Sequence, residues 1–166
     1  SKVQSWILKD DPKIVQSMYF EGNSATAEHQ DSYYLDSETN GEMVAAWIAL
    51  ETISAKAGRF FICPKSHKFK LDDHNNISKN HEVYIHSVVQ KIKDENLPII
   101  APALNQGDVL FWNSLTIHGS LDSHDLNQSR SSITCHAIPN KKKFVELQHI
   151  TSDLITEKFF NTYIYR

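Results

Sequence analysis

The sequence predicts a mainly β fold, an antiparallel sandwich or barrel, from three observations. Short runs of β-branched and aromatic residues dominate the chain, turn-forming residues separate them, and one longer stretch has a helical period. The expected strands are Ile14 to Phe20, Met43 to Leu50, Arg59 to Cys63, Val109 to Trp112 and Ser132 to Ile138. The expected turns are Glu21-Gly22-Asn23, Asn40-Gly41, Ala57-Gly58, Gln106-Gly107-Asp108 and Asp122 to Gln128.

One segment departs from the strand pattern. Ile85, Val88, Val89 and Ile92 follow the i, i+3, i+4, i+7 spacing of an amphipathic helix, with polar and charged residues off that face. We therefore expect a helix over roughly residues 81 to 95. The polar stretch 70 to 80 before it is expected to be a loop, and residues 153 to 160 a short second helix.

Size and composition indicate one domain, residues 1 to 166. A chain of 166 residues supports one hydrophobic core rather than two. With 40% hydrophobic and 22% charged residues, and no apolar run of membrane-spanning length, the sequence excludes a disordered or membrane-embedded chain. The N-terminus lacks the pattern of a secretory signal, so a cytoplasmic setting is expected.

Charge and cysteine content exclude further classes. A net charge of −3, with no basic stripe beyond Lys141 to Lys143, argues against nucleic acid as a partner. Cys63 and Cys135 lie in apolar, strand-like settings, which are typical of buried free thiols. A disulfide scaffold or a thiolate zinc site is therefore not expected.

A histidine and an aspartate two residues apart form the first part of a candidate metal site. His29 and Asp31 follow a predicted strand and turn. On an extended backbone, side chains at positions i and i+2 leave the same face, about 6.5 Å apart along the chain. That spacing suits adjacent coordination positions on one metal ion, but a single pair also arises by chance. A third ligand is needed.

His118 is the candidate third ligand. It follows the Gln106-Gly107-Asp108 turn, and a small antiparallel barrel can bring such a segment beside an earlier strand. Two imidazoles and one carboxylate on one face of an octahedron are the ligand set of non-haem iron oxygenases, which leaves three positions open. Zinc hydrolases also use His and Asp ligands, but they need fewer open positions and usually an additional carboxylate as base. For His118 taken alone, a core histidine is the simpler interpretation.

Arg130 favours the interpretation of His118 as a ligand over that of a core histidine. It lies 12 residues beyond His118, at the start of a predicted strand, flanked by serines and followed by apolar sequence. Its planar guanidinium suits end-on binding of a dicarboxylate. Ser120, two residues past His118, is expected to face the same side. Alone, Arg130 would be interpreted as a surface residue, but together with the three candidate ligands it predicts a co-substrate site.

With these residues, the sequence resembles the phytanoyl-CoA dioxygenase family of iron(II)- and 2-oxoglutarate-dependent oxygenases. The resemblance covers most of the chain and rests on motifs that follow one another in the order and spacing of the family. These are Val15-Gln16-Ser17-Met18, His29-Gln30-Asp31, Trp47-Ile48-Ala49-Leu50-Glu51, Gly58, Pro64-Lys65-Ser66-His67-Lys68, Gly107-Asp108-Val109-Leu110-Phe111-Trp112, His118-Gly119-Ser120 and Arg130.

The resemblance implies a fold and a set of residue roles. The fold would be a double-stranded β-helix, a jelly-roll or cupin-like barrel, with one or two flanking helices. The iron would be bound by His29, Asp31 and His118. The distal carboxylate of 2-oxoglutarate would be held by Arg130 and Ser120, with Met18 and Trp47 against it and Gln16 as a weaker candidate.

The resemblance also implies a reaction. With Fe(2+), 2-oxoglutarate and dioxygen, the protein would hydroxylate an unidentified small organic substrate and release succinate and CO2. Hydroxylation is expected rather than halogenation, because Asp31 fills a position at which halogenases have a small residue. Two alternatives stay open, a jelly-roll metalloprotein independent of 2-oxoglutarate and a catalytically silent barrel that binds a small molecule or a protein. We expect no membrane partner, and a monomer or homodimer.

Two features depart from the family pattern. Lys65 stands where most members have glycine, which is expected to alter a loop but not the metal site. Only about 13 residues precede the first motif strand, where members usually have a long helical segment. We therefore expect the co-substrate pocket around Trp47 and Arg130 to be more open than usual. The other histidines are not expected to be ligands, with His67 ordering its loop and His74, His81, His86, His124, His136 and His149 left without a role.

Overall fold

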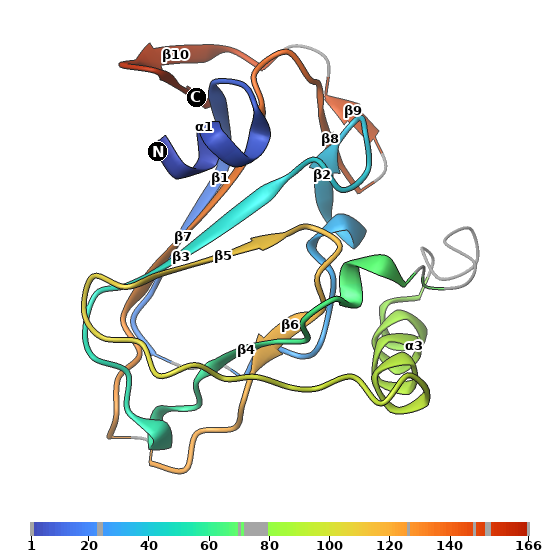
Figure 1. Ribbon diagram of the computed structural model, residues 1–166, viewed down its shortest axis with the longest axis vertical. Coiled ribbons are helices and arrows are strands. Elements are labelled where there is room, and N and C mark those ends of the chain that lie inside the picture. Colours follow the sequence, from blue (N-terminus) through green and yellow to red (C-terminus); the bar gives the residue numbers. More distant parts are fainter. Residues whose placement is uncertain are drawn as a thin grey trace.

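Strands predominate in the computed structural model, which describes residues 2–22, 25–69, 71, 80–125, 127–147, 149–151 and 154–165 (Figure 1). Within these residues there are two α-helices, α1 (Lys2–Leu8) and α3 (His81–Asp94). Three single 3-10 turns occur as well, η1 (Asp31–Tyr33), η2 (Ala55–Ala57) and η3 (Ser66–Lys68). The prediction of a mainly β fold with one or two flanking helices is confirmed.

The largest sheet has six strands in the order β10-β11-β1-β7-β3-β5. Its members are β1 (Pro12–Phe20), β3 (Val44–Ala49), β5 (Val109–Asn113), β7 (Ser132–Pro139), β10 (Thr156–Phe159) and β11 (Thr162–Tyr165). Neighbouring strands are antiparallel except β1 and β11, which are parallel. Figure 1 shows β1, β7, β3 and β5 running together through the centre of the molecule.

Two smaller sheets complete the strands. β4 (Phe60–Ile62) pairs with β6 (His118–Ser120), and single bridges extend this pair from His118 to His29 and from Ile62 to Ile100. β2 (Leu35–Ser37), β8 (Phe144–Glu146) and β9 (His149–Thr151) form the other sheet. Trp47 of β3 and Trp112 of β5 share a buried cluster with Phe60 of β4, so the large sheet and the β4–β6 pair form two packed layers.

The two helices lie on different parts of this sandwich. α1 contacts β1, β3 and β7, and its buried Gln4 interacts with Cys135. Because successive strand residues alternate, α1 covers the face of the large sheet opposite to that of Thr134 and His136. α3 begins after Asn80, whose side chain accepts hydrogen bonds from two amides of the first turn, and packs its apolar side against β4 and Ile117.

Most expected elements are present. The five predicted strands correspond to β1, β3, β4, β5 and β7, and the helix predicted at 81 to 95 is α3, so the periodicity argument is confirmed there. The loop predicted at 70 to 80 falls largely outside the described residues. The helix predicted at 153 to 160 is wrong, because residues 156–159 form β10, paired antiparallel with β11. Cross-strand pairing, which no local pattern reveals, decides the conformation of this segment.

Candidate metal and co-substrate site

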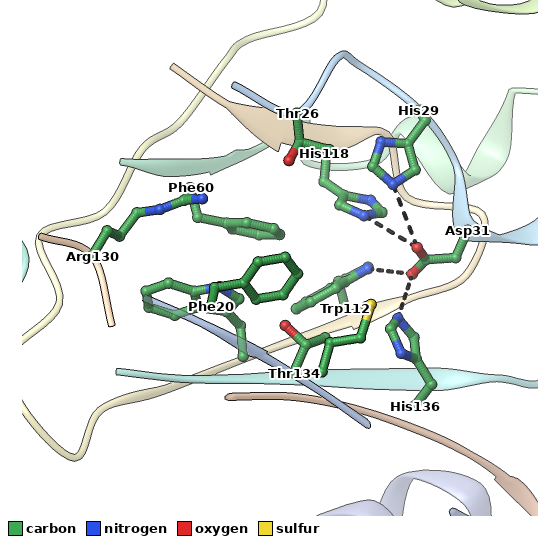
Figure 2. A pocket seen from close by; sticks show the side chains of 12 residues that line it. Phe20, Thr26, His29, Asp31, Phe60, Trp112, His118, Arg130, Thr134 and His136 are labelled. Carbon is green, nitrogen blue, oxygen red and sulfur yellow. Dashed lines mark hydrogen bonds and ion pairs between the residues drawn. The ribbon is translucent and has the colours of Figure 1, made fainter. Parts of the chain in front are cut away.

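A cavity between the two layers contains most of the predicted site residues (Figure 2). The three candidate metal ligands His29, Asp31 and His118 line it, as do Arg130, Met18 and Trp47. It is also lined by residues for which the sequence predicted no site role, namely Phe20, Thr26, Phe60, Trp112, Thr134 and His136. Figure 2 shows Arg130 at one end of the cavity and Asp31 at the other.

Backbone pairing brings the two distant histidines together. The amide of His29 donates to the carbonyl of His118 at 2.9 Å, and the amide of His118 donates back to His29 at 3.0 Å. Gln30 keeps an extended conformation, and Asp31 then turns into η1, so the same-face assumption holds only up to Gln30. The ligand atoms of His29, Asp31 and His118 all lie within 4.8 Å of one another. The predicted convergence of these three side chains is confirmed.

Backbone carbonyls orient both imidazoles. Nδ1 of His29 lies 2.7 Å from the carbonyl of Ala27, and Nδ1 of His118 lies 2.8 Å from that of Thr116. A carbonyl can only accept, so Nδ1 carries the proton in each ring, and in the neutral tautomer Nε2 keeps its lone pair. The two Nε2 atoms face Asp31 Oδ1 at 3.6 Å and 3.3 Å.

This set of atoms fits a metal ion. Two nitrogen lone pairs and one carboxylate oxygen face one another, and only a cation or added protons can satisfy all three. Neighbouring ligands of an octahedral ion at about 2.1 Å are about 3.0 Å apart, somewhat less than the 3.3 Å and 3.6 Å between Asp31 Oδ1 and the two Nε2 atoms. Asp31 is 5% exposed. Burial would raise the pKa of Asp31, but the charge of His118 and the hydrogen bonds of the surrounding imidazoles, which exist only when their Nε2 atoms carry protons, hold that pKa well below its usual value. A metal cation in place of those protons would act in the same direction, so Asp31 is ionised in either case.

The second oxygen of Asp31 has partners of its own. The indole N–H of Trp112 donates to Oδ2 at 2.8 Å, and Nε2 of His136 lies 3.5 Å from the same atom. In the large sheet Ala45 pairs with Trp112 on one side and with His136 on the other. The small side chain of Ala45 leaves room for both larger residues to approach Asp31. Oδ2 of Asp31 thus faces Trp112 and His136, whereas Oδ1 faces the two candidate ligand histidines, His29 and His118.

Arg130 is a buried cation with incomplete hydrogen bonding. It is 3% exposed, and its Nε and Nη1 atoms have no hydrogen-bond partner within the described part of the chain. Burial lowers its pKa. Its Cζ atom lies 6.0 Å from the ring centre of Trp47, which is 2% exposed. Since an unpaired buried guanidinium is costly, this geometry predicts an anionic ligand in the cavity.

The prediction of an unusually open pocket is wrong, because this chain itself buries both Trp47 and Arg130. Glu51 holds the loop that carries Arg130, since its carboxylate accepts from the Ser131 amide at 2.5 Å and the Ser129 hydroxyl at 2.7 Å. These two hydrogen bonds lower the pKa of Glu51. Both neighbours of Arg130 are thus anchored to the end of β3.

Ser120 and Gln16 do not line the cavity. The Ser120 hydroxyl instead accepts a hydrogen bond from the Thr26 amide at 2.7 Å. Gln16 lies half-buried on β1, opposite His136. The hydroxyl groups at the cavity come from Thr26 and Thr134, for which the sequence predicted no role.

Two further residues depart from expectation. His136 has no ligand spacing in the sequence, but it shares a strand face with Ser132 and Thr134, and that alternation of polar residues in an apolar strand was the available signal. Lys65 has φ 70° and ψ −1°, the left-handed conformation that glycine adopts freely. The loop thus keeps a backbone suited to glycine although a lysine occupies this position.

His74 lies outside the described residues.

Neither of the helices that the structure describes is long and apolar enough to cross a membrane.

The family model described as phytanoyl-CoA dioxygenase (PhyH) matches residues 5–130. The peroxisomal phytanoyl-CoA dioxygenase of Homo sapiens is 26% identical over 132 residues, which cover 78% of this chain and 38% of that protein. The Mus musculus protein is 30% identical over 110 residues, covering 65% and 32%. The chain therefore spans well under half the length of these relatives.

Solved structures share the fold at low sequence identity. The non-heme alpha ketoglutarate dependent carbocyclase SnoK has a TM-score of 0.67 and 17% identity, covering 90% of this chain and 57% of its own. EctD from S. alaskensis, with 2-oxoglutarate and 5-hydroxyectoine, has a TM-score of 0.62 and 18% identity, covering 85% and 49%. These likenesses confirm the jelly-roll fold.

Proposed function

We propose, from the premise that this chain belongs to the phytanoyl-CoA dioxygenase family, that it is an iron(II)- and 2-oxoglutarate-dependent oxygenase. The proposed reaction hydroxylates a small organic substrate and releases succinate and CO2, with residues 1 to 166 acting as one domain. One observation carries the proposal. Two histidines and an aspartate that could hold a metal ion share a cavity with a buried arginine, whose Nε and Nη1 atoms have no hydrogen-bond partner among the described residues.

The metal would be held by Nε2 of His29, Nε2 of His118 and Oδ1 of Asp31. A set of two histidines and one carboxylate with open positions is the ligand arrangement of non-haem iron(II) oxygenases. Bound iron with 2-oxoglutarate and dioxygen supplies the oxidising chemistry, in which decarboxylation of the co-substrate accompanies reduction of dioxygen. Because Asp31 occupies the carboxylate position and is ionised, we propose hydroxylation rather than halogenation.

Arg130 would bind the far carboxylate of 2-oxoglutarate. Its guanidinium lies at one end of the cavity, with Nε and Nη1 buried and without hydrogen-bond partners among the described residues, and one edge of a guanidinium can donate two N–H groups to a single carboxylate. The flat ring of Trp47 and the side chain of Met18 border the same cavity and would exclude water from the bound chain. The protein would thus orient the co-substrate at both ends and exclude water from it.

A combined binding and turnover experiment tests the proposal. Purified protein is loaded with Fe(2+) under anaerobic conditions and titrated with 2-oxoglutarate. Succinate is then measured after addition of dioxygen and candidate substrates, with acyl-CoA thioesters as the first class because the matched relatives are named for one. We expect metal-dependent 2-oxoglutarate binding and succinate release that substrate stimulates.

The controls separate this proposal from the alternatives. Asp31→Ala should abolish metal binding, whereas Arg59→Lys, at an arginine that does not line the cavity, should change neither binding step. Metal binding without any effect of 2-oxoglutarate would overturn the co-substrate assignment and favour a 2-oxoglutarate-independent metalloprotein. Absence of metal binding by the folded protein would favour the catalytically silent barrel.

A further inference from the structure

Tyr84 connects helix α3 to the segment that carries two of the candidate metal ligands. The Tyr84 hydroxyl accepts a hydrogen bond from the amide of Gln30 at 2.7 Å and donates one to the carbonyl of the same residue at 3.1 Å. Tyr84 is 1% exposed, so water does not compete for these bonds. A single hydroxyl therefore contacts both backbone polar groups of Gln30.

Gln30 is the residue between His29 and Asp31. Its backbone angles, φ −109° and ψ 133°, determine how the side chains on either side are directed. On one side this segment is already attached to the 114–118 stretch, because His29 pairs with His118 and the Gln30 side chain donates to the Leu115 carbonyl at 2.5 Å. Tyr84 adds two hydrogen bonds to the same residue from helix α3.

Packing alone accounts for the Tyr84 ring but not for its hydroxyl. The ring stacks on Tyr33 at 3.7 Å with an interplanar angle of 11°, and it belongs to the apolar cluster that includes Val88. A phenylalanine would keep these contacts. The oxygen serves only the Gln30 backbone among the hydrogen bonds that the structure describes.

We propose that Tyr84 is a positioning residue for the metal pair, holding the Gln30 peptide groups so that His29 and Asp31 direct their ligand atoms to one point. This inference rests on the proposed function, because it assumes that the pair binds metal. Residues that orient metal ligands through hydrogen bonds typically contribute about 10- to 100-fold to metal affinity. Loss of the hydroxyl leaves the buried Gln30 amide without its partner, while the Gln30 carbonyl keeps only the Tyr33 amide at 3.2 Å, and this should widen the range of orientations open to Asp31.

The test compares Tyr84→Phe with a matched control, Val88→Ala. Val88 is 0% exposed, lies one turn later on α3 and shares the cluster of Tyr84, and its apolar side chain cannot hydrogen-bond to Gln30. Affinity for Co2+, which resists oxidation better than iron, is measured by calorimetry on the metal-free protein, together with Tm. Hydrogen exchange of the Gln30 amide gives a second, local measurement.

We expect Tyr84→Phe to weaken Co2+ binding by at least about tenfold and to accelerate exchange of the Gln30 amide. Val88→Ala should lower Tm at least as much but leave the Co2+ affinity within about twofold of wild type. If Tyr84→Phe is too unstable for titration, the Co2+ concentration that raises its Tm reports the same affinity, because binding to the folded state stabilises it.

Three outcomes are distinguishable. Unchanged Co2+ affinity in Tyr84→Phe overturns the inference and leaves the proposed function in place. Equal weakening by Val88→Ala overturns it as well, because helix stability alone would then explain the effect. Absence of Co2+ binding in the folded wild-type protein overturns the proposed function, and the inference with it.

Discussion

Replacement of Arg130 tests the co-substrate assignment most directly. A carboxylate bound end-on accepts from two N–H groups of a guanidinium, and each hydrogen bond to a charged group contributes about 1.5 to 3 kcal/mol. Lysine keeps the charge but loses the planar fork, so Arg130→Lys should lose about 1.5 kcal/mol, or about tenfold in 2-oxoglutarate affinity. Arg130→Ala also removes the charge from this 3% exposed position, which should cost about 2 to 4 kcal/mol, or about 30-fold to nearly 1000-fold.

The assay is calorimetric titration of 2-oxoglutarate into Co2+-loaded protein, with Co2+ affinity measured separately. The metal affinity should be the same in wild type, Arg130→Lys and Arg130→Ala, because Figure 2 shows Arg130 at the opposite end of the cavity from Asp31. Arg59→Lys serves as the control for a lost guanidinium elsewhere. Wild-type 2-oxoglutarate affinity in Arg130→Ala would refute the assignment, as would a parallel loss of metal affinity.

The same residue predicts an effect on stability. Nε and Nη1 of Arg130 are buried without partners in the described residues, and an uncompensated buried cation destabilises the folded state. Arg130→Met should therefore raise the Tm of protein free of 2-oxoglutarate, while removing the further rise that 2-oxoglutarate gives to the wild type. A lower Tm in Arg130→Met would show that the guanidinium contributes stabilising contacts of its own.

Three further substitutions follow from individual contacts. Trp112→Phe removes the 2.8 Å hydrogen bond to Asp31 and should weaken Co2+ binding, measured by calorimetry, about tenfold. Unchanged Co2+ affinity would show that Asp31 is oriented without this hydrogen bond. Glu51→Gln removes one of the two acceptors that hold the loop carrying Arg130. It should raise the KM for 2-oxoglutarate about 3- to 10-fold and leave the Co2+ affinity unchanged. A loss of Co2+ affinity would contradict a local role of Glu51. Lys65→Gly removes the steric strain of a side chain in the left-handed backbone conformation. It should raise the free energy of unfolding, measured by denaturant titration, by about 0.5 to 1 kcal/mol. A decrease would argue against that conformation of residue 65.

Local patterns in the sequence were sufficient to predict the main elements and the cluster of candidate metal ligands. Strand and helix periods depend on neighbouring residues, so the five principal strands and α3 were predictable. The identities of His29, Asp31 and His118 followed from ligand chemistry, because few side chains bind a metal in such a set. Their convergence within 4.8 Å agrees with that prediction.

Only the tertiary structure decided which other residues surround these ligands. His136 and Trp112 meet at Asp31 because strand register places both beside Ala45, and register is set by long-range pairing rather than by local sequence. Tyr84 contacts Gln30 across 54 positions of the chain for the same kind of reason. Ser120, whose position beside His118 favoured a cavity role, instead pairs with Thr26 because β6 directs its hydroxyl to the neighbouring backbone. The sequence by itself predicted which side chains could bind a metal, because ligand chemistry depends on residue type. Packing between distant strands and α3 decided which groups surround those side chains, because such contacts join residues far apart in the chain.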